Sequence, residues 1–225
     1  MQPEPDRTDV TTAARWAGWS LLAITASLLI AHGGSMIVAG QRVTGTSDFQ
    51  LIQEFYSYRE LLPLYWQHGL GVVIFGGFII CFHRFMRDQA TKTIDRLLLA
   101  TGVIAAASVI PLALTELGLQ AALVQLSDTQ ASEAILGVFA SWDWIYNSFF
   151  YWLEAVWVGA FSLLLLRTQA LPRWIAVLGL VVASLHVFHS AVLMLGLPDA
   201  VTLPGTALFL VWFIATGIQL VRWGR

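Results

Sequence analysis

Charged residues are scarce in this chain: they make up 12% of its 225 residues, whereas 57% are hydrophobic. Soluble domains carry roughly 25% charged residues, so this composition excludes an ordinary globular domain and favours an integral membrane protein. The formal net charge is only −2, which gives no reason to expect a nucleic-acid partner. The partner that the composition predicts is the lipid of a membrane.

Cysteine is almost absent as well. Cys81 is the only one, which excludes an intramolecular disulfide and any multi-cysteine zinc or iron–sulfur site within one chain. The first residues are polar and partly acidic, with Glu4, Asp6 and Asp9, and they lack the basic start of a secretory signal. We therefore expect residues 1–15 to form a polar cytoplasmic tail and the first apolar run to be an uncleaved span.

Long apolar runs, by contrast, are plentiful. A membrane-spanning helix needs about 20 mostly apolar residues, and the runs predict one all-α domain over residues 16–225, a polytopic bundle of six transmembrane helices. The predicted spans are 16–39, 61–82, 97–117, 144–166, 174–197 and 206–221. A short interfacial helix is expected on the outer surface at about 47–60, because Ser47 and Gln50 fit a capping box.

Basic residues predict the orientation of the bundle. Loops on the cytoplasmic side of a membrane carry an excess of Lys and Arg. Ten basic residues lie at the two ends of the chain and in the even-numbered connections, against two, Arg42 and Arg59, in the odd-numbered ones. The ten are Arg7, Arg15, Arg84, Arg87, Lys92, Arg96, Arg167, Arg173, Arg222 and Arg225. Both termini are therefore expected in the cytoplasm, in a bacterial-type inner membrane.

A layer of ionisable residues is predicted inside the spans. Such residues are costly in a bilayer and so mark functional sites by default. At a rise of about 1.5 Å per residue, five of them, from four spans, fall at similar depth in the outer half of the membrane. They are His32, His68, Glu154, His186 and His189. No Lys or Arg lies deep in any predicted span, so a carboxyl group here must stay protonated, pair with histidine or bind a metal.

The directions in which these side chains project from their helices also support this layer. His186 and His189 are three residues apart and so project from one side of their helix. Asp143 and Glu154, together with Asn147 and Tyr151, recur at helical spacing, which predicts one polar stripe towards the bundle interior. Asp143 itself, like Glu116, falls near the outer edge of the hydrocarbon core, where water reaches it.

Three functions fit these residues. The leading hypothesis is a metal or haem centre, because imidazole is the commonest protein ligand for iron, copper and zinc. His32, His68, His186 and His189 would bind a b-type haem or a transition metal, with Glu154 as a further metal ligand.

The second hypothesis is a membrane enzyme acting on an isoprenoid, a sterol or another lipid, a hydrophobic small-molecule substrate. Glu154, kept protonated by burial, would be the general acid and Asp143 would assist it. The third is a structural or accessory subunit, held together by histidine–glutamate hydrogen bonds and associated with a partner membrane protein. Whether the protein is an enzyme therefore stays open at this point.

The last third of the chain carries a resemblance. Residues 171–180 read LPRWIAVLGL and follow a span that closes with LLLLR. This part resembles a broad group of uncharacterised six-span bacterial membrane proteins of similar length. The matching residues form a cytoplasmic turn and helix start, with Pro172 at the start of the helix and Arg173 on the positive side. The resemblance implies the six-span fold, and it implies no activity, cofactor or site.

Overall fold

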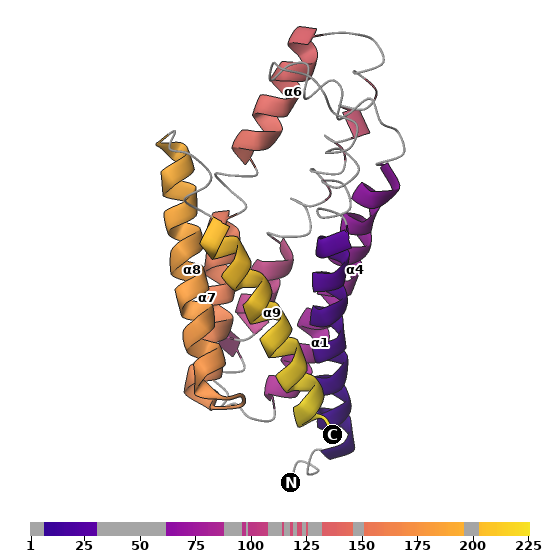
Figure 1. The fold of residues 1–225 in the computed structure, drawn as a ribbon. Helices are drawn as coiled ribbons and strands as arrows, with labels where there is room; N and C mark the ends of the chain where they lie inside the picture. Colours follow the sequence, from indigo (N-terminus) through magenta and orange to yellow (C-terminus); the bar gives the residue numbers. More distant parts are fainter. Residues whose placement is uncertain are drawn as a thin grey trace.

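The computed structural model describes residues 7–30, 62–87, 96–97, 99–107, 132–145, 151–195 and 203–225, with isolated positions between 114 and 125. Its main helices are α1 (Arg7–Leu28), α4 (Leu62–Arg87), α6 (Ser132–Ile145), α7 (Tyr151–Thr168), α8 (Arg173–Met194) and α9 (Leu203–Trp223). They are shown in Figure 1. No strand occurs among the described residues, so the predicted all-α class is confirmed for this part of the chain.

Two of the described helices are long and apolar enough to cross a membrane. These stretches, Arg173–Val192 in α8 and Pro204–Trp223 in α9, coincide closely with the fifth and sixth predicted spans. Their length and composition favour membrane association. The full set of six spans stays a prediction, since much of residues 31–61 and 108–131 lies outside the described part of the chain.

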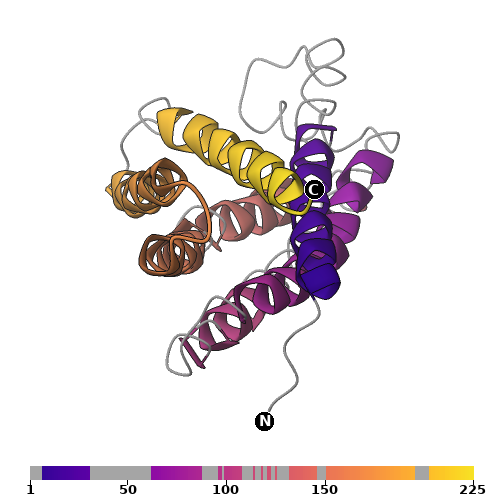
Figure 2. The same ribbon diagram turned by 90° about the horizontal axis from the view of Figure 1, so that it is seen from below.

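The helices form an antiparallel bundle with both chain ends at one end of it (Figure 1). α1 packs against α4 and α9, while α8 packs against α7 and α9. An exposed ion pair of 2.6 Å between Arg84 Nη2 and Asp9 Oδ2 joins the last turn of α4 to the first turn of α1. Seen from this end in Figure 2, α9 runs from the α7–α8 pair towards α1 and so connects the two halves of the bundle.

Two glycines allow α1 and α9 to approach each other closely. A Cβ on Gly18 would lie 2.6 Å from the carbonyl oxygen of Gly217, and a Cβ on Gly217 would lie 3.0 Å from the carbonyl oxygen of Gly18. Both distances are shorter than a relaxed contact between non-bonded atoms. Small residues of this kind at helix crossings are typical of membrane bundles, where tight packing holds helices together.

An aromatic cluster fills the interior between α4, α7 and α9. It consists of the buried side chains of Phe75, Phe78, Phe82, Trp157, Phe161, Phe209, Trp212 and Phe213. Of its two indole nitrogens, Trp212 Nε1 donates a hydrogen bond of 3.1 Å to the carbonyl oxygen of Ile175 in α8, whereas the buried Trp157 Nε1 has no partner among the described residues. Gly179 leaves room for that indole: a Cβ there would lie 2.5 Å from Trp212 Nε1. The cluster thus fixes α9 against α7 and α8.

Several helix limits differ from the predicted ones. α1 begins at Arg7, inside the predicted polar tail of residues 1–15. Asp9 lies in its first turn, where a carboxylate is stabilised by the positive end of the helix dipole. α6 was not predicted at all, and Figure 1 shows it beyond the end of the bundle that is opposite the chain termini. The predicted interfacial helix at 47–60 lies outside the described residues.

Substitution of Gly18 tests the α1–α9 crossing. Gly18→Ala places a methyl group against the backbone of α9, and we expect it to lower the free energy of unfolding by about 1–3 kcal/mol. Gly77→Ala is the matched control, because a Cβ on Gly77 has no atom within 4 Å. Unfolding in SDS titrations of detergent-solubilised protein, followed by circular dichroism, measures both. Equal stability of the two variants would contradict the close crossing.

Candidate functional site

A buried histidine–glutamate pair connects α7 and α8. Glu154 lies in the first turn of α7 and His186 lies in the second half of α8. Their side chains are 8% and 1% exposed, and His186 Nδ1 is 3.2 Å from Glu154 Oε2. The two atoms are within ion-pair distance, although they are not aligned as a hydrogen bond. The position of Glu154 at the start of a helix favours a carboxylate there, because the helix dipole is positive at that end.

Aromatic rings surround both histidines. The ring of Tyr151 stacks on that of His189, with centroids 3.8 Å apart and planes 24° apart, and it meets His186 edge-on at 5.3 Å. Phe209, from the first half of α9, lies 5.0 Å from His186. His189 and the neighbouring Ser190 are also buried. Tyr151 thus lies against both buried imidazoles, and Phe209 of the aromatic cluster lies against that of His186.

The Nε2 nitrogen of His186 is buried and has no partner among the described residues. Glu154 faces Nδ1, whereas the buried Nε2 has no hydrogen-bond partner among the residues that the structure describes. The first turn of α9 lies close to the Cδ2 atom of this ring, because a Cβ on Gly205 would be 3.9 Å from it. A buried nitrogen without a partner costs about 1–3 kcal/mol. Such a nitrogen is therefore a candidate for contact with a ligand or with a further side chain.

The predicted site residues fall into three groups. Glu154, His186 and His189 come together around Tyr151. His68 lies on α4, but its side chain is outside the described part of the structure, as are His32 and Glu116 entirely. Asp143 lies on α6, which ends at Ile145, whereas Glu154 lies on α7, which begins at Tyr151. Residues 146–150 between these two helices, and with them Asn147, lie outside the described residues, so the stripe through Asp143 and Glu154 stays a prediction.

Two aromatic residues of the site, Tyr151 and Phe209, were not predicted from the sequence as site residues. The sequence contained a signal for Tyr151, because it precedes Glu154 by three residues and so lies on the same face of the helix. The sequence contained no signal for Phe209, because its contact with His186 depends on how α9 packs against α8. Neither ring supplies a charge, and both limit the space beside the imidazoles.

The donor set restricts which metal sites are possible. No group of three His, Cys, Asp or Glu side chains in the described part of the chain is placed to hold one metal ion. A site with three or more protein ligands would need a side chain from outside the described part of the chain, such as that of His32 or His68. A haem needs only one or two axial histidines, so this restriction does not apply to it.

Comparisons with known proteins add no function to this geometry. Protein-family models, characterised proteins and solved structures were each compared with the chain, and none matches it. The resemblance of residues 171–180 to six-span bacterial proteins therefore stays a prediction, and the chemistry has to be argued from the site itself.

A double-mutant cycle tests the coupling of Glu154 and His186. We expect Glu154→Gln and His186→Leu to be non-additive by about 1 kcal/mol, as for polar pairs between membrane helices. The control cycle pairs Glu154→Gln with Thr168→Ala. Thr168 donates to the Leu164 carbonyl near the other end of α7, roughly 20 Å away at about 1.5 Å per residue. Thermal unfolding of the four proteins of each cycle gives the coupling, and additivity in the first cycle would contradict the pair.

Proposed function

We propose that this protein is a six-span integral protein of a bacterial-type inner membrane, with both termini in the cytoplasm. Apolar side chains exposed along the helices support the membrane, among them Val73 and Ile80 on α4 and Val177 and Val181 on α8. Arginines support the orientation. The first turns of α1 and α8 and the last turns of α4, α7 and α9 all lie at the end of the bundle that carries both termini (Figure 1). Basic residues are found in each of these turns or next to it: Arg7, Arg84, Arg87, Arg167, Arg173 and Arg222.

Cysteine labelling tests this topology. In a Cys81→Ser background, we expect Arg225→Cys to react with a membrane-impermeant maleimide only in inside-out vesicles. Leu195→Cys, at the opposite end of α8 and exposed, is expected to react only from the outside, in spheroplasts. Labelling of both positions from the same side would contradict the proposed orientation.

We propose further that His186 and Glu154 belong to an intramembrane metal or haem centre, and one observation carries this proposal. The carboxylate faces Nδ1 of a fully buried imidazole and leaves Nε2 as the nitrogen to bind a ligand. In protein metal sites, the histidine ligand commonly has a carboxylate at its other nitrogen, which fixes the ring and makes it a better electron donor. Glu154 would hold the ring in this way, while His189 and Tyr151 would form the wall beside it.

The remaining ligands in this proposal are His32 and His68, on the first two predicted spans. A b-type haem would be held between His186 and one of these, and an iron, copper or zinc ion would take several of them. Bound haem, iron or copper supplies one-electron chemistry, whereas zinc supplies a Lewis acid. The contribution of this chain would be a buried imidazole between aromatic rings and a carboxyl group that faces its other nitrogen.

The same pair favours a second function, acid–base catalysis on a lipid. A carboxyl group 3.2 Å from an imidazole provides a proton donor and acceptor in one buried position. Asp143, on α6, would assist Glu154 in this function. If no cofactor is bound, the pair either acts on a bound lipid or only stabilises the bundle.

Absorption spectra and elemental analysis of the purified protein test the centre. We expect a Soret band that shifts on dithionite reduction, or near-stoichiometric iron, copper or zinc. His186→Ala should remove at least nine-tenths of it, because the histidine is a ligand. His83→Ala is the control, since His83 lies near the last turn of α4, towards the opposite end of the bundle.

Each result separates the alternatives. Loss of colour or metal in His186→Ala alone, with an unchanged circular dichroism spectrum, supports the centre. A colourless, metal-free and well-folded wild-type protein contradicts it. In that case, a lipid that co-purifies with wild type but not with Glu154→Gln supports the acid–base function, and the absence of both supports a structural role.

A further inference from the structure

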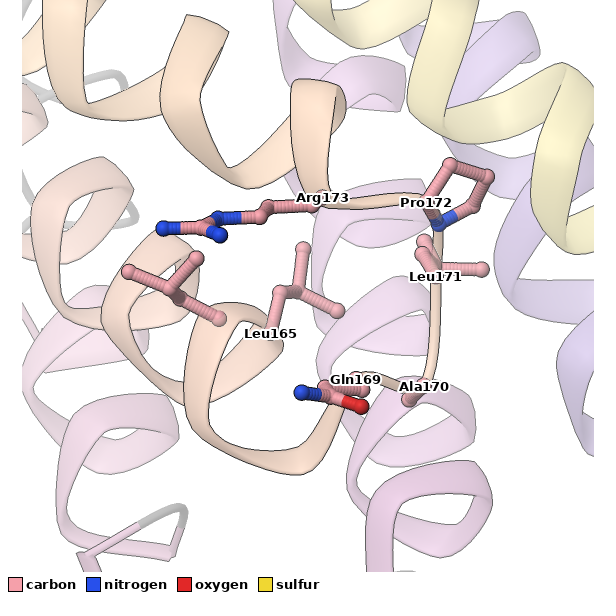
Figure 3. Close-up of a pocket in the computed structure, with 7 residues that line it drawn as sticks. Leu165, Gln169, Ala170, Leu171, Pro172 and Arg173 are labelled. Atoms are coloured by element: carbon pink, nitrogen blue, oxygen red, sulfur yellow. The ribbon is translucent and has the colours of Figure 1, made fainter.

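A cavity of about 740 Å³ opens at the turn between α7 and α8. Leu165, Ala170 and Leu171, which are buried, form part of its wall, and the exposed side chains of Gln169 and Arg173 lie at its rim. Figure 3 shows the Arg173 and Gln169 side chains extending on either side of Leu165. The cavity thus has an apolar wall and a polar rim that carries one positive charge.

The charge at this rim is uncompensated within the described structure. Arg173 is the first residue of α8, where a cation is disfavoured because the helix dipole is already positive. Arg167, in the last turn of α7, adds a second cation close by in the chain. Neither arginine forms an ion pair with any residue in the described ranges. Charge complementarity therefore favours an anionic group at the rim.

The position of the cavity indicates what carries that anion. The α7–α8 turn lies at the same end of the bundle as both termini (Figure 1), which the proposed topology places at the cytoplasmic leaflet. That leaflet contains anionic phospholipids, which attract basic residues near the ends of spans. Beyond Arg173, the apolar side chains of Trp174, Val177 and Val181 are exposed along α8, so acyl chains have an apolar surface to lie on.

We propose that this cavity binds the headgroup of an anionic phospholipid of the cytoplasmic leaflet. The Arg173 guanidinium contacts the phosphate, since its planar fork matches phosphate oxygens. The Gln169 amide donates a further hydrogen bond, and Leu165 with Leu171 packs against the glycerol region. This site rests on the proposed membrane placement and is independent of the His186 centre at the other end of the bundle.

The backbone geometry of the turn shows which substitutions leave the cavity wall intact. The turn closes with a hydrogen bond of 2.9 Å from the Gln169 N–H to the Leu165 carbonyl oxygen, and Gln169 has a φ of 53°. Replacement of Gln169 by another unbranched side chain leaves this backbone requirement unchanged. Arg173 is exposed, so its neutral variant removes a charge without opening the core.

Native mass spectrometry of protein released from phosphatidylcholine nanodiscs containing phosphatidylglycerol tests the proposal. We expect wild type to retain one phosphatidylglycerol, and Arg173→Gln to bind it about fivefold more weakly, as expected for one basic residue at an anionic surface. Gln169→Lys should bind it more tightly. Arg222→Gln, which removes an exposed arginine at the same end of the bundle on α9, is the control and should match wild type.

The outcomes are distinct. The proposal is wrong if Arg173→Gln and Arg222→Gln retain phosphatidylglycerol equally, or if phosphatidylcholine is retained as well as phosphatidylglycerol. Displacement of the lipid by millimolar inorganic phosphate would identify a site for free phosphate and would likewise overturn it. Metal or haem content, measured on the same samples, is expected to be unchanged in all three variants, so failure here is distinguishable from failure of the His186 centre.

Discussion

Close contact between helix backbones holds this bundle together, and it does so where side chains are smallest. In a membrane, apolar side chains gain little by leaving lipid for protein, so association depends on packing and on buried hydrogen bonds. Gly18 and Gly217 let α1 meet α9, and Gly179 lets the Trp212 indole reach the backbone of α8. α9 takes part in both contacts, and through it the α1–α4 pair is joined to the α7–α8 pair.

The histidine–glutamate pair depends on the same packing. His186 is enclosed because α7 brings Glu154 and Tyr151 to one side of α8, while α9 brings Phe209 to another. An imidazole in such surroundings has few neighbours with which to share a proton or a lone pair. Its two nitrogens therefore have separate environments: a carboxyl group at Nδ1, and no hydrogen-bond partner from the described residues at Nε2. This asymmetry is what a metal ligand or a directed proton carrier requires.

Much of the helical layout was predictable because it depends on composition alone. The apolar runs predicted both ends of α8 and α9 to within about three residues. The helical rise per residue placed Glu154 and His186 at a similar depth, and in the structure their side chains lie 3.2 Å apart. Features set by tertiary packing were not predictable. α6 is too short and too close to a predicted span to stand out, and Phe209 reaches the site only through the crossing of α9.

The α1–α9 crossing has a consequence for biosynthesis. Gly18 and Gly217 are 199 residues apart in the chain (217 − 18). At roughly 5–20 residues per second, synthesis of that interval takes about 10–40 s. During this time α1 lacks the helix that covers its small-residue face in the finished bundle. The bundle therefore closes only after α9 has been made, and until then α1 can pack against α4, which is made earlier.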